Sequence, residues 1–151
     1  MTLTASSEAP AFPLTGDFLA GRLRQNLSLD DLKYIEGLVD TVAEYGDTAR
    51  LLARGTKTDR STILIEGYIF RTIESAGKRF ITGIHVPGDF VDLHGFALKR
   101  LDHNIDAAGR VTVGSVSHDT LRRVMRDRPG VARAMWFATL LDAAIHRKWI
   151  Q

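Results

Sequence analysis

One stretch of the sequence, residues 63–96, constrains the fold more than any other. Two runs rich in β-branched and aromatic residues, Ile63–Glu74 and Arg79–Val86, are separated by the short polar segment Ser75-Ala76-Gly77-Lys78. Two strand-like runs joined by a short segment with glycine are typical of a β-hairpin. The sequence therefore predicts a hairpin at the centre of the chain.

A turn and an irregular polar segment follow the hairpin. Pro87-Gly88-Asp89 is a turn sequence, because proline fixes φ and glycine permits a positive one. Residues 91–105, VDLHGFALKRLDHNI, then carry histidines, acids and glycine where a plain strand would alternate. A rigid hairpin that leads into such a segment can form one wall of a ligand pocket.

Three helices are expected outside this stretch. Ser28 and Asp31 fit a capping box, and the apolar residues that follow keep helical spacing to about residue 44. Ser117 is expected to cap a second helix over residues 118–127. A third helix is expected over residues 130–150, and the apolar residues between 12 and 23 suggest a short helix that lies on the main body.

Short strands fill the remaining sequence. Residues 49–53 read as one strand, and a turn at 107–110 is expected to lead into a last strand at 111–116. Several short strands with glycine-rich turns at near-regular spacing indicate a small antiparallel roll. We therefore predict an α+β fold, a β-roll of the double-stranded β-helix (jelly-roll) type, with flanking helices and a long C-terminal helix.

The C-terminal helix carries apolar residues around most of its circumference. Thr139, Asp142 and His146 form only a narrow polar strip between two apolar stripes. A small roll covers one side of a helix, so the other side needs a second cover. We expect that cover to be the same helix of a second subunit, in a homodimer. The expected dimerisation residues are Phe137, Leu140, Leu141, Ala144, Ile145 and Trp149.

Composition narrows the classes of protein and of site. The chain has 151 residues, a formal net charge of +2 and no cysteine, which excludes disulfides, thiolate zinc sites and cysteine-ligated clusters. The N-terminus lacks a basic region followed by an apolar one, so it does not read as a secretory signal. No segment is apolar enough to predict a membrane helix, so we expect a soluble, cytoplasmic protein.

The order of these elements resembles the N-terminal sensor domain of the Crp/Fnr superfamily of transcription regulators. The motifs are Arg54-Gly55 after the first strand, Glu66-Gly67 in the hairpin, Gly88-Asp89-Phe90, and then Asp92 to Phe96. The resemblance implies a cyclic-nucleotide-binding-like roll, a dimerisation helix, and a helix-turn-helix domain that binds DNA. It predicts a disordered segment at 1–12, the sensor domain at 13–128 and the start of the dimerisation helix at 129–151. The missing DNA-binding domain is expected beyond residue 151.

The resemblance also predicts that cyclic AMP does not bind. Members that bind it carry a Gly-Glu pair for the ribose and an Arg-Ser or Arg-Thr pair for the phosphate. Those pairs align with Asp92-Leu93 and His103-Asn104 in this sequence. Leucine offers no carboxylate, and a neutral histidine lacks the guanidinium fork that matches phosphate oxygens.

The effector is therefore expected to be another small molecule, with no cofactor and no metal. A haem or metal at His94 or His103 stays open as an alternative, although the spacing of the two histidines matches no tight metal motif. We expect one histidine to form its hydrogen bonds with the local backbone and the other to be exposed to solvent. His85, His118 and His146 show no grouping in the sequence. The candidate pocket wall is Gly88, Asp89, Asp92, Leu93, His94, His103 and Asn104.

Cationic residues are expected on solvated surfaces. Lys99 and Arg100 read as part of a solvated loop, and Arg79 as a surface residue of the hairpin. The densest basic run contains acids and does not share one helix face, so a solvated helix is favoured over a nucleic-acid patch. That run is Arg122, Arg123, Arg126, Arg128 and Arg133.

Two other classes of protein remain alternatives. One is a stand-alone ligand-binding or dimerisation module without DNA binding; the apolar helix shows no stop signal at its end, which favours a truncated regulator instead. The other is a cupin-like metal enzyme, but the sequence contains no His-x-His pair and no paired nucleophile and base. We therefore expect that the protein is not an enzyme.

Overall fold

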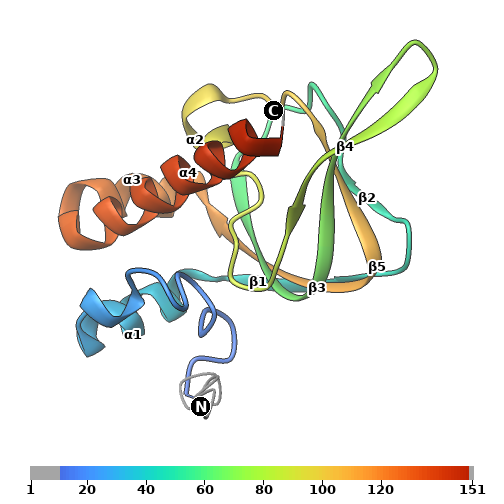
Figure 1. Cartoon of the computed structure of the whole chain (residues 1–151). Helices are drawn as coiled ribbons and strands as arrows, with labels where there is room; N and C mark the ends of the chain where they lie inside the picture. Colours follow the sequence, from blue (N-terminus) through green and yellow to red (C-terminus); the bar gives the residue numbers. More distant parts are fainter. Residues whose placement is uncertain (1–10, 150–151) are drawn as a thin grey trace.

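The computed structural model describes residues 11–149, apart from the side chain of Trp149. The strands lie together on one side of the molecule, and the helices gather on the other (Figure 1). The strands are β1 (Thr41–Tyr45), β2 (Arg50–Leu52), β3 (Arg60–Ser75), β4 (Lys78–His85) and β5 (Asn104–Ser117). The helices are α1 (Leu29–Leu38), α2 (His94–Leu98), α3 (His118–Asp127) and α4 (Pro129–Trp149), with a 3-10 helix at Arg24–Asn26.

All strand pairs are antiparallel. The order in the sheet is β1-β5-β3-β4, and β2 also pairs with β5. The long strands β3 and β5 pair from Arg60↔Ser117 to Thr72↔Asn104, so they form the spine of the roll. This sheet with flanking helices and a long C-terminal helix confirms the predicted fold class.

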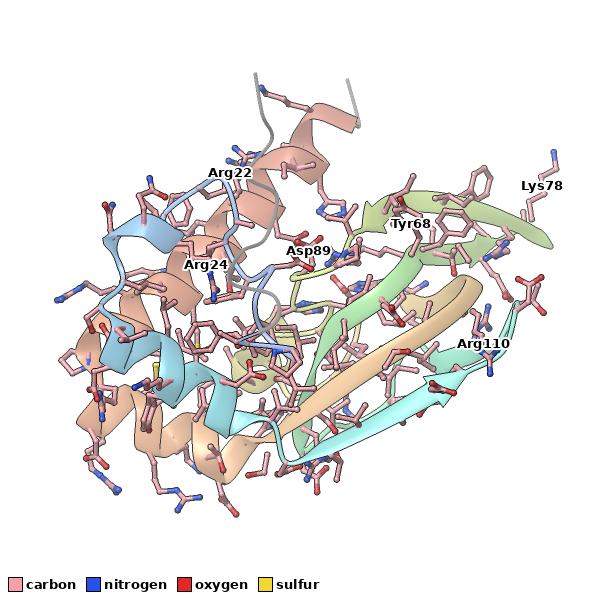
Figure 2. All side chains as sticks on the ribbon, turned by 90° about the horizontal axis from the view of Figure 1, so that it is seen from below. Arg22, Arg24, Tyr68, Lys78, Asp89 and Arg110 are labelled. Carbon is pink, nitrogen blue, oxygen red and sulfur yellow. The ribbon has the colours of Figure 1, made fainter. Side chains whose placement is uncertain are left out.

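The predicted central hairpin is confirmed. Strands β3 and β4 pair from Ile69↔His85 to Ser75↔Lys78, which leaves a two-residue turn. The turn residues Ala76 and Gly77 have φ angles of 51° and 75°. Positive φ at both positions is the geometry whose twist matches the flanking strands. Lys78, next to this turn, extends away from the body of the molecule (Figure 2).

Both predicted helix caps are present, but α1 is shorter than expected. Ser28 Oγ accepts a hydrogen bond from Asp31 N at 3.0 Å, and Ser117 Oγ accepts one from Thr120 N at 3.1 Å. Helix α1 ends at Leu38, not near residue 44. The next residues form β1, which pairs with β5. Their β-branched side chains suit a strand, and the pairing with β5 decides the outcome.

Three other segments differ from the sequence prediction. Residues 107–110 are not a turn, because β5 runs without interruption from Asn104 to Ser117. The irregular segment contains the short helix α2. Residues 12–23 form consecutive turns, not a helix. Their anchor is the 3-10 helix residue Arg24, whose buried guanidinium donates to the carbonyl oxygens of Thr15 and Phe18 (Figure 2).

Two apolar cores hold the domain together. The helical core joins α1, α3 and α4 to one end of the sheet, through side chains such as Ile35, Leu121 and Met135. The roll core fills the space between the strands, through side chains such as Ile69, Ile105 and Val111. Within residues 11–149, no helix is both long and apolar enough to cross a membrane.

Candidate effector site

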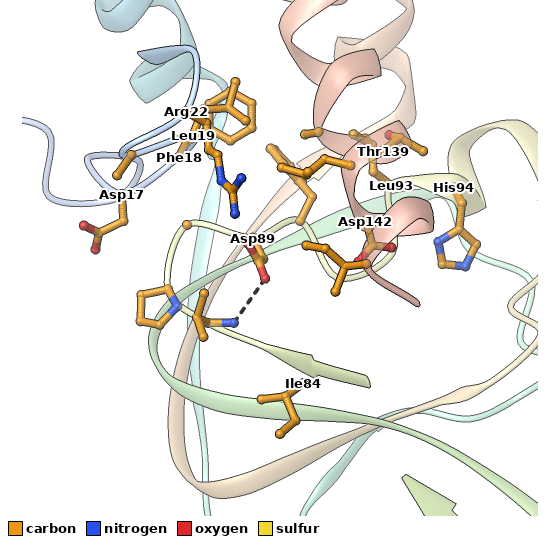
Figure 3. A pocket seen from close by; sticks show the side chains of 18 residues that line it. Asp17, Phe18, Leu19, Arg22, Ile84, Asp89, Leu93, His94, Thr139 and Asp142 are labelled. Atoms are coloured by element: carbon orange, nitrogen blue, oxygen red, sulfur yellow. Dashed lines mark hydrogen bonds between the residues drawn. The ribbon is translucent and has the colours of Figure 1, made fainter. Parts of the chain in front are cut away.

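A cavity of about 440 Å³ lies between the roll, the N-terminal turns and helix α4 (Figure 3). Its walls combine apolar side chains with a few charged ones, which is the usual composition of a small-molecule site. The charged and polar side chains in the lining are Asp17, Arg22, Asp89, His94, Thr139 and Asp142. The apolar lining includes Phe18, Leu19, Ile84, Leu93, Leu141 and Ile145.

Four of the seven predicted pocket residues line this cavity: Gly88, Asp89, Leu93 and His94. Gly88 has a φ of 96°, and a Cβ atom there would lie 2.2 Å from the carbonyl oxygen of Asp17. Only glycine allows this turn to sit against the N-terminal segment. The Asp89 carboxylate closes the same turn by accepting a hydrogen bond from the Val86 backbone N–H at 3.1 Å (Figure 3).

The other three predicted residues do not line the cavity. Asp92 is fully buried, and its Oδ1 accepts a hydrogen bond from Thr62 N at 2.6 Å. Burial raises the pKa of Asp92 to about 7. Asn104 is also buried, and its side-chain oxygen accepts from Arg54 N at 2.7 Å. Both residues therefore support the backbone of the roll.

His103, the third of these residues, packs against His94. The two ring centroids are 5.0 Å apart, and His103 Nδ1 lies 2.5 Å from Asp102 Oδ1. Burial lowers the pKa of both imidazoles, that of His103 to about 4, and the charge of Arg71 adds to this effect. The expectation that one histidine is satisfied locally and the other exposed is therefore wrong, because the fold brings α2 against the start of β5.

A polar contact joins helix α4 to the hairpin. Arg71 of β3 donates to Asp142 Oδ2 at 2.9 Å and lies 3.3 Å from His85 Nε2. On the next turn of α4, the His146 ring lies over Gly83, where an added Cβ atom would be 2.0 Å from Nε2. The His85 and His146 rings are 6.1 Å apart, so the view that these histidines show no grouping is corrected.

Sequence reasoning missed this contact, although it identified the polar strip that takes part in it. Asp142 and His146 belong to that strip of α4. A charged strip on a mostly apolar helix could have signalled a buried partner. The identity of that partner, Arg71, depends on how the hairpin folds back over the helix, and nothing in the local sequence gives it.

A second cavity, of about 610 Å³, opens into the roll beside Arg50, Arg79 and Asp106. The Asp106 carboxylate accepts hydrogen bonds from Arg50 Nε at 2.7 Å, from Thr72 Oγ1 at 2.6 Å and from Arg79 at 3.2 Å. Arg79 was expected on the surface; its side chain is 47% exposed, yet its guanidinium reaches this interior carboxylate. Asp106 and Glu74, which pairs with Arg50 at 3.1 Å, offset the two cationic charges.

Of the other basic residues expected on solvated surfaces, Arg128 differs, because it is half-buried over the Tyr34 ring and donates to Asp30 at 2.7 Å. The others agree with the expectation. Lys99 and Arg100 are exposed. In the basic run, Arg122 pairs with Asp119, and Arg126 pairs with Asp127. These exposed pairs contribute little to stability.

The outer face of α4 exposes large apolar side chains. Trp136 and Leu140 on this face are 66% and 57% exposed, whereas Ile145, which is 42% exposed, lies on the cavity side of the helix. Of the predicted dimerisation residues, Phe137, Leu141 and Ala144 are half-buried, and the Trp149 side chain lies outside the described residues. Trp136, which is not among the predicted residues, lies one turn from Leu140 on the same face. Four neighbouring side chains of β4 and the following turn are also exposed: Phe80, Ile81, Ile84 and Val86.

No protein-family model matches the sequence, and no curated protein matches it. Among solved structures, the chain is similar to the c-di-GMP-responsive global regulator CLP of Xanthomonas campestris, with 11% identity over 81% of this chain and 60% of that chain, and a TM-score of 0.71. It is similar to the N-terminal domain of a transcriptional regulator from Streptomyces coelicolor A3(2), with 16% identity, coverages of 85% and 91%, and a TM-score of 0.66. It is also similar to FixK2 from Bradyrhizobium japonicum, with 19% identity, coverages of 74% and 56%, and a TM-score of 0.65.

These structural neighbours are Crp/Fnr-type regulators and cyclic-nucleotide-binding domains. Because the identities are 11–19%, the likeness shows the fold alone. At that level, it confirms the resemblance to the Crp/Fnr sensor domain. The chain spans 60% of the length of the Xanthomonas regulator and 56% of the length of FixK2.

Proposed function

We propose that this chain is the effector-sensing and dimerisation domain of a Crp/Fnr-type, DNA-binding transcription regulator that does not respond to cyclic AMP. One observation carries the proposal: helix α4 forms a wall of the 440 Å³ cavity and also presents an exposed apolar face. A single rigid element therefore connects a ligand site to a candidate subunit interface.

The lining of the cavity supports this coupling. A small molecule there would contact Leu141 and Asp142 on α4, and Asp89 and His94 on the roll. It would bias the position of α4 by the difference between its affinities for the alternative positions. A shift of α4 in a dimer would change the angle between subunits, which is a common switching motion.

The exposed face of α4 supports dimerisation. Trp136 and Leu140, one turn apart near the middle of the helix, form a short row of large exposed apolar side chains, whereas Ile145 lies on the side of the helix that faces the cavity. A second copy of the same helix would cover this row in a two-fold interface. In a full regulator, a two-fold dimer would place two recognition helices one DNA turn apart, so that they meet a pseudo-palindromic operator.

The lack of a cyclic AMP response follows from two side chains. Leu93 and His103 occupy the positions where the resemblance expects a carboxylate and a guanidinium. Each lost charge-assisted hydrogen bond costs roughly 1.5–3 kcal/mol. His103 is also packed against His94 and held by Asp102, so it is not free to meet a phosphate.

Dimerisation is tested by sedimentation of the purified chain at increasing concentration. We expect a monomer–dimer equilibrium that Leu140→Glu shifts at least tenfold towards monomer. The matched control is Leu98→Glu, since Leu98 is also exposed, at 64%, but belongs to α2 and not to α4. A monomer at every concentration, or equal effects of the two variants, would contradict the proposal.

The cyclic AMP prediction is tested by calorimetry. We expect no measurable heat of binding to the chain at micromolar concentrations. A double variant, Leu93→Glu with His103→Arg, reintroduces the two missing groups and serves as the informative comparison. Micromolar binding to the unmodified chain would rule out the stated specificity.

A further inference from the structure

Three side chains converge where α2 meets the start of β5. His94 Nε2 lies 3.8 Å from Asp102 Oδ1, and His103 Nδ1 lies 2.5 Å from the same oxygen. One potential ligand atom from each residue falls within 4.8 Å of the others. Among the residues that the structure describes, this is the one group of at least three histidines and acids that meets this distance.

Two nitrogens of this group have no hydrogen-bond partner. His94 Nε2 and His103 Nε2 are both buried, and within residues 11–149 no group bonds to either of them. Buried polar atoms are nearly always partnered, because leaving one unsatisfied costs about 1–3 kcal/mol. A fold that buries two imidazole nitrogens side by side without partners suggests a ligand that accepts their lone pairs.

The charge state of the cluster suits a cation. Imidazole is the commonest nitrogen ligand of metals, and the unpartnered Nε2 atoms of His94 and His103 lie on two adjacent rings that can offer their lone pairs. Asp102 is 76% exposed, so it supplies an ionised carboxylate on a side chain that can rotate. The positive charge of Arg71 would repel a cation. The Asp142 carboxylate, which lies 2.9 Å from the Arg71 guanidinium, offsets that charge.

We propose that His94, Asp102 and His103 bind a divalent first-row transition-metal ion, such as Zn²⁺. Two imidazoles and one carboxylate are a ligand set that such ions favour, with the fourth position left for water or a small ligand. Bonds of about 2.1 Å require ligand atoms about 3.4 Å apart, so ligand atoms that now lie within 4.8 Å of one another must approach by at most about 1.4 Å. Rotation of the exposed Asp102 side chain and a small shift of α2 would suffice.

This site goes beyond the sensor function proposed above and does not depend on it. His94 also lines the 440 Å³ cavity, so a metal there would place a charged group at the edge of the effector site. The bound ion would tie α2 to β5 and give the orphaned nitrogens partners. The expected result is an increase in stability when metal is added, in proportion to its affinity.

The test is calorimetric titration of the untagged chain with Zn²⁺, together with the visible absorption of the Co²⁺ form. We expect one ion per chain. His94→Gln, His103→Gln and Asp102→Asn should each lower the affinity by about tenfold or more. His118→Gln and His146→Gln are matched controls, because those histidines lie outside the cluster, and they should leave affinity unchanged.

Three outcomes would overturn the proposal. One is the absence of Zn²⁺ and Co²⁺ binding to the folded chain. Another is unchanged affinity in Asp102→Asn, a variant of an exposed residue that should fold normally. The third is loss of binding in His146→Gln, which would move the site to the His85–His146 pair. The metal titration is done at a protein concentration where sedimentation shows a monomer. Metal binding is then measured independently of dimerisation.

Discussion

The two halves of helix α4 are held by different physical forces. In the first half, Val131 and Met135 are fully buried in the helical core with α1 and α3. In the second half, the contact with the roll is polar, through Asp142 and Arg71, and a cavity separates the surfaces. The first half is thus an anchor, and the second is a contact that can be rearranged.

The difference shows where a signal could act. Apolar burial is non-directional and large, so it fixes the anchor whatever the chemistry nearby. An ion pair beside a cavity depends on geometry and on neighbouring charge, so a ligand or a proton can alter it. The exposed apolar row, Trp136 and Leu140, follows directly after the anchor, near the middle of the helix.

The largest expected effect comes from breaking the anchor. Met135→Ala would leave a void in the helical core, and deleting a buried methionine side chain typically costs about 2–5 kcal/mol. Denaturation with urea, at a concentration where the chain is monomeric, measures the loss. The matched control is Met125→Ala on α3, because Met125 is 43% exposed and should change stability by roughly 0.5 kcal/mol or less. Similar losses in both variants would show that the anchor is not the main support.

The next largest expected effect is a pH dependence of the free energy of unfolding, caused by the buried carboxyl of Asp92. The unfolded carboxyl releases its proton near pH 3.8, but the folded one does so only near pH 7. The folded state therefore holds an extra proton between these values, and stability falls as the pH rises through that window. At 1.36 kcal/mol per pKa unit, the fall amounts to at most about 4 kcal/mol.

Asp92→Asn removes this titration. Relative to the unmodified chain, the variant should gain stability from pH 4 to pH 8, with little difference at pH 4. The variant is compared with the unmodified chain because His103 titrates in both and has the opposite effect. The pKa of His103 is about 4 in the folded state, so its contribution to stability is lost as the pH falls from about 6.5 to 4. A stability difference that stays constant with pH would show that the Asp92 carboxyl titrates normally.

A smaller effect is expected from crowding the second half of α4. Gly83→Ala would place a Cβ atom 2.0 Å from His146 Nε2, so the ring must move. Such overpacking costs about 1–3 kcal/mol. The same substitution in a His146→Ala background should cost much less, and a double-mutant cycle in urea measures the coupling. An equal cost in both backgrounds would mean that His146 does not rest on Gly83.

The smallest effect on the monomer is expected at the exposed row. Trp136→Ala removes a side chain that is 66% exposed, so the stability of the monomer should change by about 0.5 kcal/mol or less. The dimer constant measured by sedimentation should fall much more. A large loss of monomer stability without a change in association would assign Trp136 to the anchor instead.

The sequence by itself determined the local structure of this protein. Ser28 and Ser117 cap helices because their hydroxyls accept backbone N–H groups within the same turn. Ala76-Gly77 forms the hairpin turn because the flanking residues favour strands and glycine tolerates positive φ. The polar strip of α4 was also readable, since it follows from the helical repeat.

Only the tertiary structure decided the contacts between distant segments. Residues 41–45 continue a helical spacing, but pairing with β5 makes them a strand. The partner of Asp142 is Arg71, which is 71 residues away, and the His94–His103 pair forms because α2 folds back against β5. Short-range patterns carry no information about such pairings, because their energy depends on burial and charge that exist only once the roll has closed.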